Sequence, residues 1–400
     1  MMDPGGTQRG SFGSGCSHEQ AYSGHGGKEN TLEEAAESWR GRRVFLTGHT
    51  GFKGSWLALW LSRLGAQIRG YALDPCTQPN MFTLTSISTV LDDIRGDIRD
   101  YAKLEASMTE FAPDVVLHLA AQPLVRRSYA DPLGTYSTNV MGTAHVLEAV
   151  RKTPSVRAVV CVTTDKCYQN QEWVWPYRET DPLGGYDPYA SSKACSEIVS
   201  AAFRSSFFPP ERLHEHHVGL ATARAGNVIG GGDWSEDRLI PDLVRGFGSG
   251  QPVLIRCPNA IRPWQHVLEP LHGYMMLTQK LLAQHGQFAC AYNFGPSDDD
   301  VWPVERIATK LVAMWGDGAS WIRDSVPGVH EAHVLRLDAS KARLELCWKP
   351  QLGVEAALEW TMAWYRAWSR GDNMAEFTRS QIAAYEKFNP TSRLDSKGNG

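Results

Sequence analysis

The sequence lacks the marks of a secreted, membrane-spanning or nucleic-acid-binding protein. Its eight cysteines form no CxxC pair, which disfavours a disulfide framework or a thiolate metal site. It has no apolar run near the roughly 20 residues that cross a bilayer, and no apolar signal-peptide core at its N-terminus. A formal net charge of -4 gives no general attraction for nucleic acid. We therefore expect a cytoplasmic protein with no metal, membrane or nucleic-acid partner.

The two ends of the chain are poor in apolar residues. Residues 1–41 are rich in Gly, Ser, His and Gln. Such a segment buries too little surface to offset its ordering entropy. We expect a disordered tail over residues 1–41, with at most a short helix over 31–40, and a flexible C-terminus over residues 386–400.

From residue 42 onward, apolar strands alternate with helical patterns. Strands are expected over residues 44–47, 68–73, 114–119 and 158–163. Helices are expected over residues 55–64, 136–152 and 189–207. Strands separated by helices need crossover connections, so the alternation predicts an α/β fold with a Rossmann-like, doubly wound parallel sheet.

The alternation weakens after residue 225, where Pro, Gly and Trp become more frequent. This change predicts a smaller C-terminal lobe of mixed structure that binds the substrate. We assign residues 42–218 to a dinucleotide-binding domain and residues 219–385 mainly to this lobe. A strand over residues 221–225 is expected to return to the main sheet.

A glycine-rich turn between the first strand and the first helix carries Gly48, Gly51 and Gly54. Glycines let the backbone approach a diphosphate at the positive end of a helix dipole. Asp74 follows the second strand, where a carboxylate binds an adenosine ribose and repels a 2′-phosphate, which favours NAD over NADP; the alternative is a solvated turn. The other candidates for cofactor contacts are Thr50, Phe52, Asp97, Ile98, Leu119, Ala120 and Ala121.

Two short motifs carry the candidate chemistry. Tyr189 and Lys193 lie four residues apart, hence on one face of a helix. Free tyrosine has a pKa of about 10, and a neighbouring ammonium favours the phenolate that a general base needs. Thr164-Asp165-Lys166 adds an acid and a second amine, which simple alcohol oxidation does not require. Together they predict an oxidation that leads to an elimination.

Five motifs carry a family resemblance that spans residues 43 to about 368. The chain resembles the extended short-chain dehydrogenase/reductases, and among these the CDP-glucose 4,6-dehydratases. The motifs are TGHTGFKGSW (47–56), LAAQPLVRR (119–127), TDKCY (164–168), RAGNVIGGGDW (224–234) and RPWQHVLEP (262–270).

The resemblance implies a role for each catalytic candidate. Tyr189 would take the proton of the sugar's C4 hydroxyl, with Thr164 hydrogen-bonded to that hydroxyl. Lys193 would hold the nicotinamide ribose of NAD. Asp165 would protonate the departing C6 hydroxyl, and Lys166 would assist removal of the C5 proton. The implied product is CDP-4-keto-6-deoxyglucose, a precursor of the deoxysugars of surface polysaccharides.

The role of Lys166 has open alternatives. Related dTDP-glucose and GDP-mannose dehydratases carry glutamate at this place. A lysine acts as a base only if burial near cations lowers its pKa. Otherwise it stays charged and stabilises an enolate, or it forms a structural ion pair with Asp165.

The substrate lobe contributes further candidates. Arg238 and Arg262 suit a diphosphate because guanidinium forks match phosphate oxygens. The resemblance places Asn227 at the sugar nucleotide. Trp173 and Trp175 are expected to pack over the mouth of the site. The remaining substrate candidates are Gln122 and Arg126 for the sugar, and Trp264 and His266 for the base.

Two rival functions remain open at this point. The first is an epimerase, or a dehydratase for a dTDP-, UDP- or GDP-linked sugar. The second is a non-catalytic NAD-binding sensor, although such a protein has no need of the Tyr189–Lys193 pair. The helices around Tyr136 and Tyr189 are apolar on more than one face, as in relatives that pair through four helices, so we expect a homodimer.

Overall fold

The computed structural model describes residues 37–316, 318–324 and 333–388. Most of both predicted flexible ends lies outside this range. In the part of the N-terminal segment that is described, residues 37–39 are helical, within the range of the short helix considered over 31–40, and Trp39 is fully buried in the core. At the other end, Glu386 accepts a hydrogen bond from Trp60 Nε1 at 3.0 Å. Both predicted boundaries thus fall a few residues inside the described range, and Trp39 and Glu386 attach these residues to the rest of the fold.

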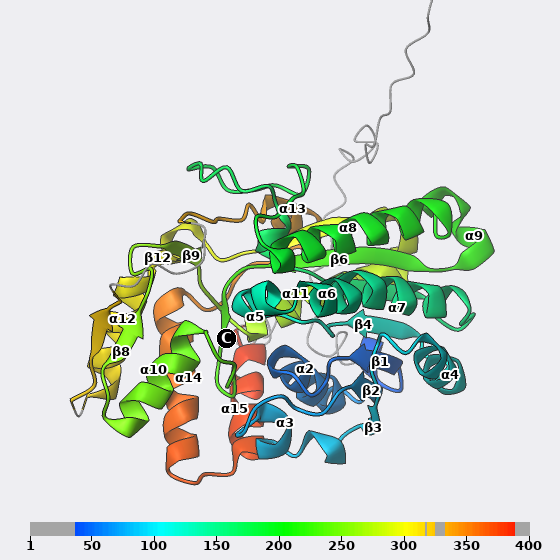
Figure 1. Ribbon diagram of the computed structural model, residues 1–400. Coiled ribbons are helices and arrows are strands. Elements are labelled where there is room, and N and C mark those ends of the chain that lie inside the picture. The colour runs from blue at the N-terminus through cyan, green and yellow to red at the C-terminus, as the bar shows by residue number, and fades with distance from the viewer. Residues whose placement is uncertain (1–36, 317, 325–332, 389–400) are drawn as a thin grey trace, which may run out of the picture.

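A seven-stranded parallel sheet forms the centre of the molecule, in the order β11-β6-β5-β4-β1-β2-β3 (Figure 1). Its strands are β1 (Arg43–Thr47), β2 (Gln67–Ala72), β3 (Asp92–Arg95), β4 (Val115–His118), β5 (Ala158–Val162), β6 (Gly219–Ala225) and β11 (Ala291–Phe294). The strand predicted over residues 221–225 does pair with β5. The chain order reverses between β1 and β4, and such a switch point opens a crevice at the carboxyl ends of the strands.

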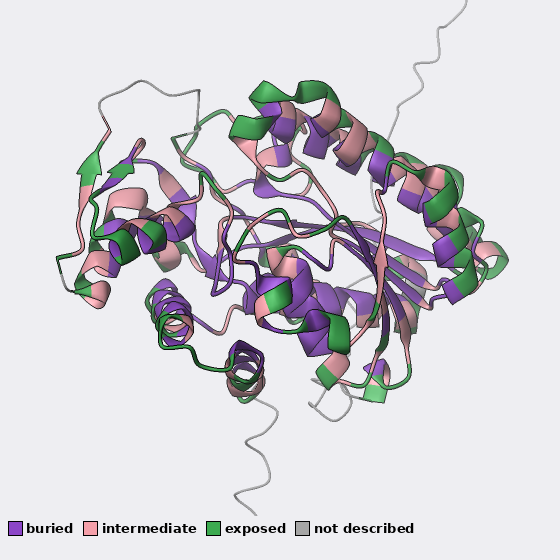
Figure 2. Cartoon of the chain, turned by 60° about the horizontal axis from the view of Figure 1, so that its bottom comes forward, coloured by how far each residue is buried: buried purple, intermediate pink, exposed green. Residues whose placement is uncertain are grey.

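Helices cover both faces of the sheet. Alternate side chains divide between them: Phe45 of β1 packs in one core cluster, and Val44 and Leu46 pack in the other. One layer contains α4 (Tyr101–Phe111), α5 (Val125–Ala130), α6 (Pro132–Tyr136), α7 (Gly142–Arg151) and α8 (Pro188–Ser206). The other contains α2 (Phe52–Arg63), α11 (Leu268–Gln284) and α15 (Met374–Glu386). Figure 2 shows the buried strands between helices whose exposed residues face outward.

The smaller lobe lies beside the carboxyl edge of the sheet, at the left of Figure 1. Its helices are α10 (Leu239–Ser249), α12 (Val304–Trp315) and α14 (Val354–Ser369). Its strands pair two by two: β7 (Val228–Ile229) with β10 (Gln265–His266), β8 (Val253–Ile255) with β13 (Trp321–Arg323), and β9 (Ile261–Pro263) with β12 (Val301–Pro303). This mixed structure is the one that the loss of alternation predicts.

Short helical segments complete the connections. They are α3 (Met81–Leu84), α9 (Leu213–His216), α13 (Ser340–Glu345) and the 3₁₀ turns Ile87–Thr89, Asp165–Cys167, Pro210–Arg212, His285–Phe288 and Asp298–Asp300. The helix predicted over 136–152 is α7 preceded by a π-helical turn, Ser137–Met141. None of the helices in the described ranges is long and apolar enough to cross a bilayer.

Candidate active site

A cavity of about 1690 Å³ opens at the switch point of the sheet. Its walls come from the glycine-rich turn, the loops that follow β4, β5 and β6, and the first turn of α10. Pockets for a single small molecule measure about 300–1,000 Å³. The volume therefore leaves room for a dinucleotide and a second ligand together.

The glycine-rich turn fits a dinucleotide. Gly48 has a φ of +79°, and a Cβ there would lie 2.7 Å from the backbone nitrogen of Ala120. A Cβ on Gly54 would lie 2.1 Å from the carbonyl oxygen of Gly48. Gly51 is the N-cap of α2 and supplies no side-chain cap, so the first N–H groups of this helix face the cavity. Such uncapped donors at the positive end of a helix bind phosphate.

The remaining cofactor candidates line the same cavity. Asp74 is exposed, and its carboxylate lies 3.6 Å from Arg95 Nη1, an arrangement open to a ribose from solvent. Asp97 pairs with Arg99 at 2.5 Å. The residues that line this side of the cavity, as expected, are Thr50, Phe52, Ile98, Leu119, Ala120 and Ala121.

His118, at the end of β4, has a structural role. Its Nδ1 lies 2.8 Å from Thr47 Oγ1 and its Nε2 lies 3.2 Å from Thr143 Oγ1. Burial lowers the pKa of His118 to about 3, so the imidazole is neutral. It orients the Thr47 hydroxyl, which accepts hydrogen bonds from the N–H groups of Leu119 and Ala120.

The TDK motif forms a tight turn at the end of β5. Thr164 Oγ1 donates to Asp165 Oδ1 at 3.0 Å and accepts from the backbone N–H of Lys166 at 3.4 Å. Lys166 Nζ lies 3.6 Å from Asp165 Oδ1. Asp165 is 1% exposed, and its Oδ2 finds no hydrogen-bond partner among the described residues. A buried carboxylate oxygen without a partner is costly, so a ligand hydroxyl in the cavity would satisfy it.

Helix α8 brings Tyr189 and Lys193 to the same cavity. Burial raises the pKa of Tyr189 to about 12, opposed by a hydrogen bond with Thr164 and by the Arg238 charge. Lys193 Nζ donates to the carbonyl oxygen of Val162 at 3.0 Å, and burial lowers the pKa of Lys193 to about 8. Arg238 is thus a cation that favours the Tyr189 phenolate in this arrangement, and the same effect of Lys193 stays a prediction.

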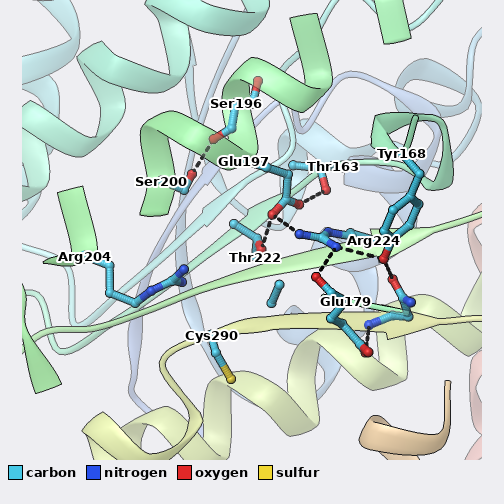
Figure 3. A network of polar contacts seen from close by, with 12 residues as sticks. Thr163, Tyr168, Glu179, Ser196, Glu197, Ser200, Arg204, Thr222, Arg224 and Cys290 are labelled. Carbon is cyan, nitrogen blue, oxygen red and sulfur yellow. Dashed lines mark hydrogen bonds and ion pairs between the residues drawn. The ribbon is translucent and has the colours of Figure 1, made fainter. Parts of the chain in front are cut away.

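A buried polar network joins α8 to the ends of β5 and β6 (Figure 3). The Glu197 carboxylate accepts hydrogen bonds from the hydroxyls of Thr163 and Thr222. Arg224 Nη2 lies 2.9 Å from Glu197 Oε2, and both side chains are buried. Arg224 Nη1 donates to Tyr168 OH at 2.8 Å. The network holds the helix that carries the YxxxK pair against the strand that leads into the TDK turn.

Basic residues from the lobe and from α5 line the far wall of the cavity. Arg238 pairs with Asp233 at 2.9 Å. Arg126 and Arg256 each lie 2.9 Å from one oxygen of Asp237. Because one carboxylate serves two guanidinium groups, guanidinium N–H donors remain at this wall for a diphosphate.

The other substrate candidates differ in whether their polar groups are open to the cavity. Asn227, Arg262 and Trp264 line the cavity, and Asn227 Oδ1 is a buried acceptor without a partner in the described part of the chain. Gln122 also lines it, but its amide bonds Thr135 Oγ1 at 2.9 Å and the backbone of Leu124. It therefore braces its own loop with both amide N–H groups, and only its carbonyl oxygen keeps a lone pair for another donor.

Three aromatic candidates lie away from the cavity walls. His266 is fully buried, with its ring 5.8 Å from the rings of both Trp56 and Trp360. Its tryptophan neighbours enclose it in the core, so it is not available to a base. Trp175 is 67% exposed and Trp173 packs on Tyr177; neither lines the cavity, because their loop projects outward.

Sequence reasoning missed several residues of the site. Asn139, in the π-helical turn, accepts from the backbone N–H of Gln122 at 2.8 Å and donates to Ser192 Oγ at 2.8 Å. This links the loop after β4 to α8.

Lys53 also lines the cavity. The sequence did contain a signal for Lys53. It lies between the last two glycines of the turn, and a charged side chain at that place points toward the ligand.

Comparisons with known proteins agree with this geometry. A model of the NAD-dependent epimerase/dehydratase family matches residues 44–295. A CDP-glucose 4,6-dehydratase from Salmonella typhimurium is 54% identical over 347 residues, which cover 87% of this chain and 97% of that protein. A dTDP-glucose 4,6-dehydratase from Xanthomonas campestris is 29% identical over 364 residues, or 85% of this chain and 98% of that protein.

Solved structures share the fold. A dTDP-glucose 4,6-dehydratase from Streptomyces venezuelae, with NAD bound, has a TM-score of 0.68 at 24% identity and covers 81% of this chain and 97% of its own. The family model covers more than half of the chain, and the Salmonella protein is similar over almost its whole length. The chain belongs to the NAD-dependent epimerase/dehydratase family.

Proposed function

We propose that this protein is an NAD-dependent CDP-glucose 4,6-dehydratase, a lyase that forms CDP-4-keto-6-deoxyglucose and water. The similarity to the Salmonella enzyme supports the substrate. The observation that carries the chemistry is Asp165: a buried carboxylate in the cavity with one unsatisfied oxygen, one residue from Thr164. An oxidation alone needs no acid at this place.

The first half of the reaction uses Tyr189, Thr164 and Lys193. Tyr189 Oη takes the proton of the C4 hydroxyl. The Thr164 hydroxyl forms a hydrogen bond that keeps the C4 oxygen oriented toward Tyr189. When bound, NAD accepts a hydride from the sugar and later returns it. Lys193, fixed on the carbonyl of Val162, is placed to hold the nicotinamide ribose.

The second half is the elimination of water. Once C4 is a ketone, the C5 proton is acidic. Asp165 supplies the proton with which the departing C6 hydroxyl leaves as water. Lys166 lies 3.6 Å from Asp165 and is one-third exposed, and an ammonium beside the developing enolate stabilises its negative charge. We assign Lys166 both roles: it takes the C5 proton, and the ammonium so formed stabilises the enolate until that proton returns to C5 as the hydride reaches C6.

The diphosphate is assigned to the basic wall formed by Arg238 and Arg262, with Arg126 at its rim. Asn227 offers a buried amide to the sugar nucleotide. Trp264 lies on the same wall, 4% exposed. We leave Gln122 and His266 out of the proposed substrate site because their side chains are committed to packing and to internal hydrogen bonds.

A panel of nucleotide sugars tests the assignment. We expect purified protein to form a keto-deoxysugar, seen by its absorbance in alkali, from CDP-glucose in preference to dTDP-, UDP- and GDP-sugars. Product from dTDP-glucose alone would refute the cytidine assignment and keep the mechanism. Interconversion of C4 epimers without loss of water would favour the epimerase alternative.

An isotope experiment tests the mechanism separately. Deuterium placed on C4 of CDP-glucose is expected on the C6 methyl group of the product, because the hydride that leaves one carbon returns to the other. Loss of the label to solvent would contradict the proposed sequence of steps.

We also propose a homodimer that pairs through the α5–α8 layer. Large apolar side chains are exposed there on successive elements: Tyr129, Leu133, Tyr136, Met141 and Ile198. Exposed apolar side chains gathered on one face are typical of a protein interface. Native mass spectrometry is expected to give the mass of two chains, and a stable monomer would contradict the proposal.

A further inference from the structure

The proposed mechanism assigns no role to Lys53, a basic residue of the cavity. It lies in the first turn of α2 and lines the cavity. Its Nζ is 6.0 Å from the centre of the Tyr274 ring. The described residues offer this amine no hydrogen bond or ion pair, whereas Lys166 pairs with Asp165 and Lys193 bonds a carbonyl.

The surroundings of Lys53 are electrostatically unfavourable for a cation. The amine sits at the positive end of the α2 dipole, where helices disfavour positive charge. Burial lowers the pKa of Lys53 to about 7, and neighbouring cations act in the same direction. The groups that face it are Arg238 of α10, Lys193 of α8, Asp165 and Lys166 of the 3₁₀ turn, and Tyr274 of α11.

A partly buried amine among cations is stabilised by an anion that enters the cavity. Among the described residues, the carboxylate that attracts this amine, Asp165, is already shared with Lys166 and Thr164. The ligands of the proposed function bring diphosphates, and the uncapped N–H groups of α2 face the same space. A lysine ammonium binds phosphate as a compact point charge.

We propose that the Lys53 side chain binds, as an ammonium, the diphosphate of a ligand in this cavity. The inference rests on the proposed function and deepens it. The diphosphate belongs either to the dinucleotide or to the nucleotide sugar. The chemistry is the same for both sources, and separate titrations distinguish them.

Isothermal titration of CDP and of NAD, each alone, tests the contact. Lys53→Met is expected to weaken binding of the diphosphate that Lys53 contacts by about tenfold to a hundredfold, as for a lost charge-assisted hydrogen bond. Lys53→Arg is expected to retain most of the affinity because it keeps the charge. A loss with CDP assigns the contact to the nucleotide sugar, and a loss with NAD assigns it to the cofactor.

Proton uptake provides a second readout that does not depend on turnover. Titration in two buffers of different ionisation enthalpy gives the number of protons bound with the ligand. At about pH 6 Lys53 is already charged and contributes little uptake, whereas at about pH 8 it is mostly neutral until the ligand arrives. Wild type is therefore expected to take up more protons than Lys53→Met at the higher pH, and equally few at the lower pH.

Lys310→Met is the matched control, since Lys310 is partly exposed on α12 and pairs with Glu355 away from the cavity. It is expected to bind both ligands like wild type. Unchanged affinity and uptake in a folded Lys53→Met protein, judged by circular dichroism, would overturn the inference. If wild type binds CDP but makes no product from CDP-glucose, the proposed function fails while the Lys53 contact is still judged by its own titrations.

Discussion

Replacing Tyr189 with Phe is expected to lower kcat by about 10²- to 10⁴-fold, the usual contribution of a positioned general base. The substitution removes one oxygen from a side chain that is 8% exposed and keeps its ring packing. Burial raises the pKa of Tyr189 to about 12, while the Thr164 hydroxyl and the Arg238 charge lower it. The phenolic oxygen therefore sits where proton transfer is required, and the variant should lose chemistry and keep its fold.

The measurement is steady-state turnover of CDP-glucose together with the affinity for CDP. We expect kcat to fall and the affinity for CDP to change little, because the proposed mechanism has Tyr189 contact the sugar and not the diphosphate. Tyr129→Phe serves as the control, since Tyr129 lies on the outer surface of α5 and does not line the cavity. Wild-type turnover by Tyr189→Phe would overturn the assignment of the base.

Replacing Arg224 with Met is expected to lower the free energy of unfolding by about 3–5 kcal/mol. The change leaves the Glu197 carboxylate buried without its cation, although the hydroxyls of Thr163 and Thr222 still donate to it. Removal of one member of a buried pair costs more than the pair itself contributes, because the remaining charge stays desolvated. Denaturant unfolding measures this difference.

The pH dependence of the stability penalty distinguishes the loss of the Arg224 charge from the loss of its packing contacts. With Arg224 present, the pKa of Glu197 is below its ordinary value despite burial. Without the guanidinium, burial raises that pKa, so the folded variant prefers protonated Glu197 and loses stability as pH rises through the raised value. The penalty of Arg224→Met should thus be larger near pH 8 than near pH 5. A penalty independent of pH would contradict the charge argument.

A double variant completes the test. Glu197→Gln combined with Arg224→Met removes both charges and keeps an amide for the two hydroxyls, so it should be more stable than Arg224→Met alone. Arg370→Met, at an exposed arginine paired with Asp372, should change stability by less than about 0.5 kcal/mol. A double variant as unstable as the sum of the single changes would show that the two residues do not interact.

The local features of the fold were predictable because each has a local cause. Short buried apolar runs separated by helical patterns indicate β1, β2, β4 and β5 directly. The glycine-rich turn was predictable too, since Gly48 and Gly54 occupy positions where a Cβ would collide with backbone. Helix boundaries were less certain: the π-helical turn before α7 depends on Asn139 and its hydrogen bonds to Gln122 and Ser192, which lie in other elements.

Contacts between distant segments were not predictable from residue types. His266, in a motif shared with relatives, appears polar in sequence yet is enclosed by Trp56 and Trp360. Gln122 lies at a ligand-binding edge, but its amide is used by Thr135 and its own backbone. In each case the preference of a polar side chain for water was overridden by neighbours that the chain order does not reveal.

The sequence by itself determined the chemical groups of this protein and their local order: a glycine-rich turn after a strand, a TDK turn after another, and a tyrosine and lysine on one helical face. The tertiary structure decided which groups meet. It placed Lys53 of α2 and Asp165 of the β5 loop on the walls of one cavity, and paired Glu197 with Arg224 across 27 positions of the chain. The physical reason is that charge pairing, burial and the resulting pKa shifts depend on distances in space, which strand order and packing determine.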